Sequence, residues 1–353
     1  MMNSNFNNRK TNMTIKIRLL ASTLLIAAGT TAQAENLSVT AFGGSWEQAF
    51  RTCYVEPYVA ASGNTVDVNI GSPTQWVNQI AANADNPPID VLVNLMDTAA
   101  IAINDELVEP FDAAKIPNLA KVPEAFQNPL QGYGTVINFG AAGLGYMESR
   151  VSNPPQDWTA FFDGIIAGDY VASLPGINVG STTPTALLWN LFDIMEIPLD
   201  QPEEVMAKLS EAVESGNVIF FNDMNQYLTQ LQSGEADIGI YWDGRAWTAK
   251  DGGIDDLNFY YPQPGGIISP SVVQKVANGS DAGWDFINTM LDAENQGCFA
   301  NAVGYAVVNS EVEYAEPLAS RAPSYQDVRW PDFAGISEQM PTWVDQWNRT
   351  VGR

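Results

Sequence analysis

The segment IGIYWDGRAW, residues 238–247, places three side chains with ligand-binding chemistry next to one another. The indole face of Trp242 attracts a cation or an aliphatic chain. Asp243 supplies a carboxylate, and the guanidinium of Arg245 is a permanent charge whose planar donors suit a carboxylate, phosphate or phosphonate. The alternatives are a core tryptophan at a sheet edge and an ion pair of Arg245 with Asp243 or Asp223. The segment therefore indicates either a charged binding site or the packed end of a strand.

Turns rich in Gly, Ser and Thr join other strand-like and helical segments. Free backbone amides at the start of a helix, together with the helix dipole, favour a negative group there. The same residue types are ordinary helix caps, so each turn has this second interpretation. The candidates from these turns are Gly44, Ser45, Trp46, Ser72, Trp76, Ser181, Thr182 and Thr183.

The chain contains no histidine. This excludes Ser-His-Asp and Cys-His catalytic systems, histidine-ligated zinc and histidine general bases. The adjacent Tyr260 and Tyr261 are the one pair that suggests an iron site, and NFYYP at 258–262 is explained better as a strand. GLG at 143–145 does not extend to a dinucleotide fingerprint, and the sequence has no P-loop. We therefore expect neither a metal nor another cofactor.

The N-terminal segment has the pattern of a secretory signal peptide. Basic residues precede an apolar run at 19–28, and an Ala-x-Ala pattern follows it. We predict a signal peptide over residues 1–34, cleaved after Ala34, and export to the periplasm; a retained N-terminal anchor is the alternative. Translation starts at Met1 or at Met13, and the second start gives a signal peptide of more ordinary length.

Charge and cysteine content narrow the range of partners. Beyond residue 34 the chain keeps 12 basic and all 41 acidic residues, a net charge of −29. Nucleic acids and anionic membrane surfaces would repel such a chain, so we expect neither as a partner. Cys53 and Cys298 are the two cysteines of an exported protein, and they form either a long-range disulfide or two separate buried thiols.

Strand-like and helix-like segments alternate along the chain in two series. This alternation predicts α/β lobes with mostly parallel sheets, and the length of the chain suggests two of them. In the first series, strands are predicted at 37–42, 65–71 and 87–96 and a helix at 98–111. The second series begins after residues 132–147, which are predicted to be two short β-like runs interrupted by Gly140 and Gly143.

The order of FGGSW, SPTQWVNQI, PIDVLV, ELVEPFD, FGAAGLGYM, SGEADIGIYWDG and GYAVVN resembles the polyamine-type periplasmic solute-binding proteins of ABC importers. The resemblance covers residues 37 to about 309. It implies the type II periplasmic binding protein fold, with a ligand cleft between two lobes that close by hinge motion. Lobe 1 would comprise 35–138 with 268–353 and lobe 2 would comprise 139–267, with hinges near 137–142 and 263–270.

The resemblance also implies roles for single residues. Trp242 matches the aromatic that stacks on the ligand, and Tyr305 matches a position near the cleft; with Trp46 and Trp76 they would form its walls. The sequence departs from the family at Ser269 and Ser271, where the family pattern carries an aromatic and an acid. Polyamines need several paired carboxylates, because burying their cations unpaired is costly.

These departures favour an amino acid, betaine, phosphonate or small carboxylate as the solute, and a polyamine is the alternative. We expect a monomer that delivers the solute to an inner-membrane ABC permease and catalyses no reaction. Two alternatives from other classes are an exported hydrolase that works through a carboxylate pair and a secreted structural or sensory module.

Overall fold

The computed structural model describes residues 34–179, 182–324 and 328–352. Residues 1–33 of the predicted signal peptide, and Ser181, lie outside these ranges. Eleven strands of the described chain join one sheet. Its order is β2 (Thr65–Ile70), β1 (Asn36–Ala41), β3 (Val91–Leu95), β9 (Gly266–Lys275), β4 (Thr135–Met147), β7 (Ile238–Trp242), β5 (Ala172–Pro175) and β6 (Val218–Phe221). In addition, β8 (Leu257–Tyr260) and β10 (Ala306–Val307) pair with β4, and β11 (Val328–Arg329) pairs with β9.

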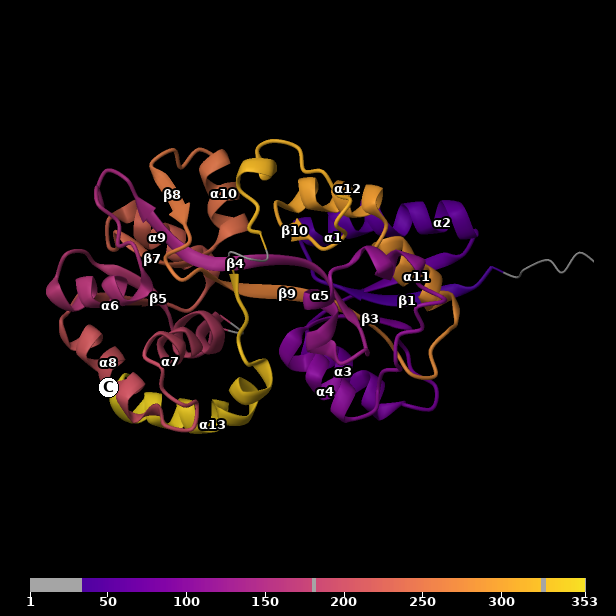
Figure 1. Cartoon of the computed structure of the whole chain (residues 1–353), viewed down its shortest axis with the longest axis horizontal. Coiled ribbons are helices and arrows are strands. Elements are labelled where there is room, and N and C mark those ends of the chain that lie inside the picture. Colours follow the sequence, from indigo (N-terminus) through magenta and orange to yellow (C-terminus); the bar gives the residue numbers. More distant parts are fainter. Residues whose placement is uncertain (1–33, 180–181, 325–327, 353) are drawn as a thin grey trace, which may run out of the picture. The chain divides into compact units, whose positions relative to one another are not determined.

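Helices form two groups around this sheet (Figure 1). The first group comprises α1 (Ser45–Phe50), η1 (Arg51–Val55), α2 (Glu56–Ser62), α3 (Pro73–Ala82), α4 (Met96–Asn104), η2 (Pro117–Lys121), α5 (Glu124–Gln127), η3 (Asn128–Leu130), α11 (Ala282–Met290) and α12 (Ala293–Val303). The second comprises α6 (Trp158–Ala167), η4 (Thr183–Trp189), α7 (Asn190–Ile194), α8 (Pro202–Glu214), α9 (Met224–Ser233), α10 (Asp243–Asp251) and α13 (Phe333–Thr350). A short turn, η5 (Leu318–Ser320), precedes β11. Within the described ranges, no helix combines the length and the apolar character needed to cross a membrane.

The sheet is mixed, whereas the sequence predicted mostly parallel lobes. The outer strands agree with the prediction, because β1 runs parallel to β2 and β3, and β5 runs parallel to β6 and β7. The central strands do not agree: β4 is antiparallel to both β9 and β7, and β9 is antiparallel to β3. A chain that passes from one half of the sheet to the other and then returns must run in opposite directions at the two crossings, which explains the difference.

The segment with the interrupting glycines is one continuous strand, β4, and not two short runs. Neither Gly140 nor Gly143 has a positive φ. A Cβ atom at residue 140 would lie 2.6 Å from Asp243 Oδ1, and one at residue 143 would lie 2.4 Å from the carbonyl oxygen of Tyr260. These glycines therefore admit close neighbours to the strand and do not end it.

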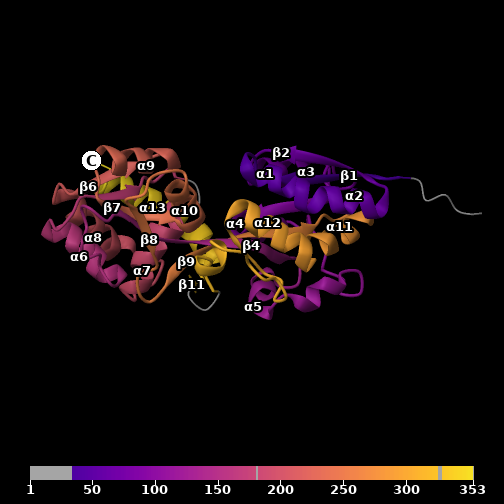
Figure 2. The same cartoon turned by 90° about the horizontal axis from the view of Figure 1, so that it is seen from above.

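Two hydrophobic clusters meet along the crossing strands. On β4, Ala141 belongs to the first cluster and Ala142 to the second; on β9 the change falls between Ile268 and Ile267. We call the elements around these clusters the first and second lobes (Figures 1 and 2). Helix α13 buries Trp343 and two further side chains in the second cluster, whereas the sequence predicts that the whole C-terminal tail belongs to lobe 1.

Local sequence signals explain several element ends. Asp157 caps α6, because its carboxylate accepts a hydrogen bond from the amide of Ala160 at 2.7 Å. Gly234 ends α9 with a left-handed conformation, as its position after the last helical turn predicts. The helix predicted at 98–111 is shorter than expected: α4 stops at Asn104 because Glu106 adopts a φ of 57°.

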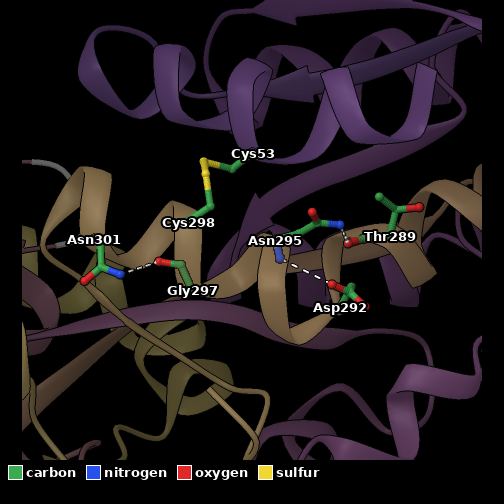
Figure 3. Close-up of a disulfide and its surroundings, with 7 residues drawn as sticks. All are labelled: Cys53, Thr289, Asp292, Asn295, Gly297, Cys298 and Asn301. Atoms are coloured by element: carbon green, nitrogen blue, oxygen red, sulfur yellow. Dashed lines mark hydrogen bonds between the residues drawn. A yellow bond between two sulfur atoms is a disulfide. The ribbon is translucent and has the colours of Figure 1, made fainter. Parts of the chain in front are cut away.

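A disulfide joins Cys53 of η1 to Cys298 of α12, which confirms one of the two interpretations of the cysteine pair (Figure 3). Their Cα atoms are 5.6 Å apart, a separation typical of disulfides. Both cysteines lie in the first lobe, and they are 245 residues apart in the sequence, so the bond closes a long loop. Most of that loop consists of the second lobe and the two crossing strands.

Replacing both cysteines by serine is expected to lower the free energy of unfolding by about 2 to 4 kcal/mol, because the open unfolded chain gains conformational entropy. The melting temperature with and without a reducing agent measures this effect, and the double variant should not respond to the reductant. Two titratable thiols in the unfolded, oxidised wild-type protein would contradict the prediction.

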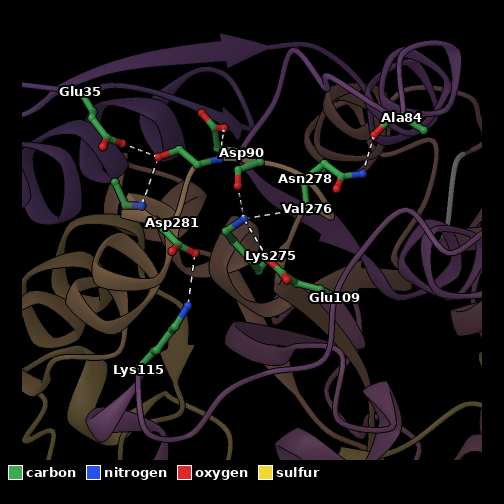
Figure 4. Close-up of polar contacts among 12 residues, drawn as sticks. Glu35, Ala84, Asp90, Glu109, Lys115, Lys275, Val276, Asn278 and Asp281 are labelled. Carbon is green, nitrogen blue, oxygen red and sulfur yellow. Dashed lines mark hydrogen bonds and ion pairs between the residues drawn. The ribbon is translucent and has the colours of Figure 1, made fainter.

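A buried lysine fixes the end of β9 in the first lobe (Figure 4). The Lys275 side chain is fully buried, and its Nζ donates to the carbonyl oxygens of Val276 and Gly279 at 2.9 and 3.0 Å. Glu109 Oε1 lies 3.1 Å from the same nitrogen and supplies the opposite charge. Because each ammonium proton has an acceptor, this charge is satisfied within the lobe and is not available to a ligand.

Candidate functional site

A cavity of about 560 Å³ lies at the ends of β1, β3 and β7, next to the crossing strands β4 and β9. Ligands of open α/β sheets bind outside the carboxyl ends of strands, and this volume suits a small molecule. Residues from both lobes line it: Phe42, Gly43, Ser45, Trp46, Leu95, Asn138, Gly140, Asn225, Leu228, Tyr241, Trp242, Gly244, Arg245, Thr248, Ala249, Ser269, Ser271, Val303 and Tyr305.

Half of the ligand-binding residues predicted from the sequence line this cavity. They are Ser45, Trp46, Trp242, Arg245, Ser269 and Tyr305. The others are Gly44, Ser72, Trp76, Thr182, Thr183 and Asp243, which do not belong to its lining.

The first-lobe residues outside the lining have structural roles. Gly44 precedes α1 with a φ of 76°, a conformation that favours glycine. Ser72 caps α3, with its amide donating to the Gln75 side chain at 3.4 Å. Trp76 is buried in a separate cluster with Ile80 and Leu92. The cap interpretation therefore fits Ser72 better than a role in binding.

The two second-lobe threonines lie outside the cavity lining, and Thr182 contacts the lining residue Trp242. Thr182 Oγ1 accepts a hydrogen bond from Trp242 Nε1 at 3.1 Å, which fixes the orientation of the indole in the cavity wall. The hydroxyl of Thr183 donates to the carbonyl oxygen of Gly176 at 2.5 Å. Both threonines are buried.

Three hydrogen bonds from the protein itself hold the carboxylate of Asp243. Its Oδ2 accepts from the Ala141 amide of β4 and from the Tyr261 hydroxyl, each at 2.8 Å, and its Oδ1 accepts from the Gly244 amide at 2.6 Å. Burial raises the pKa of Asp243 to about 6, although these three donors oppose the rise. The carboxylate therefore ties the crossing strand to the start of α10.

Tyr305 packs across two glycines at the junction of the lobes. A Cβ atom at residue 140 would lie 2.9 Å from its ring, and one at residue 244 would lie 2.6 Å from it. Burial, followed by the charge of Asp243, raises the pKa of Tyr305 to about 12, so this side chain faces the cavity as a neutral phenol. Glycine is thus needed at both positions to seat the ring.

Arg245 presents the charge of the site. Its side chain is exposed and lines the cavity from the first turn of α10. It hydrogen-bonds to the phenol of Tyr241, whose pKa burial raises to about 12. None of the ion pairs in the described chain involves Arg245, so the proposed pairing with Asp243 or Asp223 does not form. Among the described lining residues Arg245 is the one charged side chain, and none is acidic.

Asn138 lies in the cavity although its position in the sequence does not predict a site residue. This amide lies on β4, lines the cavity and is 3% exposed, and its Oδ1 has no hydrogen-bond partner in the described chain. The signal was an isolated amide within the buried run TVINFGAAGLGYM. Tyr241, Asn225 and Thr248 also line the cavity without having been predicted.

A second cavity of about 210 Å³ lies beside β9 against α13, lined by Met96, Ile268, Ile336 and Met340 among others. It shares Leu95 and Ser269 with the larger cavity. The larger cavity is the better candidate because it alone of the two contains the unpaired guanidinium and the unpaired buried amide.

Comparison with known proteins identifies relatives across most of the chain. The family model for bacterial extracellular solute-binding proteins matches residues 86–339. The chain is 22% identical over 344 residues to a probable ABC transporter periplasmic-binding protein, y4fP, of Sinorhizobium fredii. That match covers 95% of this chain and 91% of the relative.

Solved structures share the architecture. A crystal structure described as an extracellular solute-binding protein from Bordetella parapertussis has a TM-score of 0.83 and 26% identity, covering 90% of this chain and 98% of that one. A structure described as a spermidine/putrescine ABC transporter from Listeria monocytogenes has a TM-score of 0.65 and 17% identity, covering 90% of this chain and 98% of that one. At this identity, the two proteins share the fold alone. These matches confirm the predicted two-lobed α/β architecture.

Proposed function

This chain belongs to the family of bacterial extracellular solute-binding proteins, and on this premise we propose that it captures a small anionic or zwitterionic solute between two closing lobes. Solute-binding proteins of ABC importers bind small molecules and deliver them to membrane permeases, and this chain is the substrate-binding component of such a transporter. The family does not determine the solute, because one fold serves many ligands.

The observation that carries the ligand class is the guanidinium of Arg245, which forms no ion pair among the described residues, in a cavity without acidic lining residues. A buried anion requires an opposite charge or several donors, and a planar guanidinium satisfies a carboxylate with two parallel hydrogen bonds. A polyamine would bury at least two ammonium groups beside this cation with no carboxylate to pair with, since Asp243 already accepts three hydrogen bonds. The chemistry therefore favours a small carboxylate, an amino acid or a phosphonate over a polyamine.

The lobe assignment follows from packing. We place residues 35–141 and 268 to about 332 in lobe 1, residues 142–267 in lobe 2, and α13 in lobe 2 because Trp343 is buried there. The hinges lie near 137–142 and 263–270, where both crossing strands pass from one cluster to the other. Closure by rotation at these strands would bring Trp46 of the first lobe toward Trp242 and Arg245 of the second.

Export follows from the N-terminal sequence and the family. We propose cleavage after Ala34 and a periplasmic monomer that docks on an inner-membrane permease. The Glu35 amide donates to Asn64 Oδ1 at 3.0 Å, so a chain that begins at Glu35 would have its first residue anchored to the first lobe.

A thermal-shift screen tests the ligand class. At a concentration of 100 times the dissociation constant, a solute stabilises the folded protein by about 2.7 kcal/mol. We expect carboxylates, amino acids or phosphonates to raise the melting temperature and spermidine and putrescine to leave it unchanged. The reverse result would support the polyamine receptor, and conversion of a screened compound, detected by mass spectrometry, would support a hydrolase.

Replacing Arg245 by alanine is expected to weaken binding of the anionic solute at least 10-fold, because a hydrogen bond to a charged group is worth about 1.5 to 3 kcal/mol. Isothermal titration calorimetry measures the change.

Arg321→Ala is the matched control for this substitution. Arg321 lies outside the cavity lining and pairs at 2.7 Å with Asp251 of α10, the helix that carries Arg245. Its replacement by alanine changes the net charge by the same amount as Arg245→Ala. Equal affinity of the wild-type protein and the Arg245 variant would assign Arg245 a role outside binding.

A further inference from the structure

Asn138 is a buried polar group without a protein partner. The run Thr135–Met147 is buried throughout, and Asn138 is the one amide in it. Its Oδ1 is shielded from solvent and unpaired among the described residues, so a ligand reaches it only when the side-chain amide rotates toward the cavity. Leaving a buried acceptor unsatisfied destabilises the folded protein, so an unsatisfied acceptor beside a cavity points to a donor supplied from that cavity.

The backbone directs this amide into the cavity. The pairing of β4 with β9 shifts register between Val136 and Asn138, which brings Asn138 opposite Ser271. Such irregularities re-aim side chains and recur next to functional sites. Asn138, Ser269 and Ser271 all line the cavity, so the crossing strands give it an uncharged polar floor.

The charged group of the cavity, the guanidinium of Arg245, lies on a different element from the polar floor. Arg245 enters the cavity from α10 of the second lobe, while the floor consists of amide and hydroxyl groups on β4 and β9. A solute that satisfies both needs an anionic group for Arg245 and, at another position, a group that donates a hydrogen bond to Asn138 Oδ1. Because no described lining residue is acidic, an ammonium donor would be buried without an opposite charge.

We propose that Asn138 selects solutes in which a carboxylate is joined to a neutral hydrogen-bond donor, a hydroxyl or an amide N–H. This inference rests on the proposed function, since it takes Arg245 as the site of the carboxylate. It separates this class from simple fatty acids and betaines, which lack the donor, and from amino acids that would place an ammonium group on the floor.

Matched carboxylates that differ at one end test the proposal by calorimetry: butanoate, 4-hydroxybutanoate, succinamate, 4-aminobutanoate and 4-(trimethylammonio)butanoate. We expect the hydroxyl and amide compounds to bind at least 10-fold more tightly than the other three. Equal binding of all five, or preference for either cation, would overturn the proposal while leaving the carboxylate at Arg245 intact. Binding of none of them would overturn the proposal, and selective binding of spermidine would overturn the proposed function as well.

Two substitutions of Asn138 separate selection from structure. Asn138→Leu keeps the branched shape of the side chain and removes the unpaired amide, so we expect a higher melting temperature without ligand and no preference for the hydroxyl compound over butanoate. Asn138→Asp supplies the missing acid, so we expect the preference to move at least 10-fold toward 4-aminobutanoate. A lower melting temperature for the leucine variant together with unchanged preferences in both variants would make Asn138 structural.

Asn94→Leu is the control. Asn94 also has a buried unpaired amide nitrogen, but it lies on β3 outside the cavity lining and its Oδ1 accepts from the Leu95 amide at 2.9 Å. This variant should be less stable and should keep the wild-type preference among the five compounds. Loss of that preference in the control would show that the effect is not specific to Asn138.

Discussion

Trp242→Ala is expected to weaken solute binding at least 100-fold, about 3 kcal/mol, and to leave the protein folded. The indole lines the cavity at the end of β7, and the hydrogen bond from its Nε1 to Thr182 Oγ1 fixes its face toward the ligand. Removing it takes away one wall of the cavity, the apolar area that the ligand would bury and the restraint on Thr182. The adjacent Arg245 would then hold its ligand group in a wider, wetter space.

Calorimetry with the best solute from the thermal-shift screen measures this loss, and circular dichroism checks the fold. Trp247→Ala is the matched control, because Trp247 lies on the neighbouring helix, outside the lining, and packs against Phe259 and Arg321. We expect the control to keep wild-type affinity. Unchanged affinity in the Trp242 variant would remove this tryptophan from the site.

The sequence allowed the fold to be predicted because its signals are local. Alternating segments, the Asp157 cap and the Gly234 stop each depend on a few neighbouring residues, and all are present in the structure. The continuity of β4 was missed because glycine usually interrupts a strand. Here Gly140 and Gly143 admit Asp243 and Tyr260, contacts from more than one hundred positions away that no local pattern reveals.

Site residues were predicted less well, for a related reason. Residue type suggested that Asp243 would bind a ligand, but its three donors come from Ala141, Gly244 and Tyr261, and only the fold brings the first and last of them together. Asn138 was overlooked because a lone amide in an apolar run has no partner pattern to search for. Its importance depends on the absence of a protein partner, which is a property of the three-dimensional arrangement.

Asp243 is expected to make the stability of the protein depend on pH. Its pKa is about 6 in the folded protein against 3.8 for a free side chain. Folding therefore favours the protonated form, and the stabilisation is fully present below pH 3.8, declines between pH 3.8 and 6, and is absent above 6. At about 1.4 kcal/mol for each pKa unit, the contribution of Asp243 to the free energy of unfolding changes by about 3 kcal/mol over the whole range.

The protonated carboxyl can keep all three contacts, which explains why the fold tolerates it. One oxygen still accepts from Gly244, and the other still accepts from Ala141 while its own proton is donated to the Tyr261 hydroxyl. The crossing strand therefore stays tied to α10 in both charge states, so neutralisation relieves the desolvation cost without releasing the hinge.

Urea unfolding of the wild-type protein and Asp243→Asn across pH 4 to 8 isolates this contribution. We expect the stability of the wild type relative to Asp243→Asn to grow by about 2.4 kcal/mol from pH 8 to pH 4, because only the wild type gains a proton on folding. Asp251→Asn gives the opposite sign, since its hydrogen bond to Arg321 lowers the pKa of that exposed carboxyl and its small contribution fades in acid. A wild-type advantage that is constant with pH would mean that Asp243 titrates normally, and the hydrogen bonds from Ala141, Gly244 and Tyr261 would then offset its burial completely.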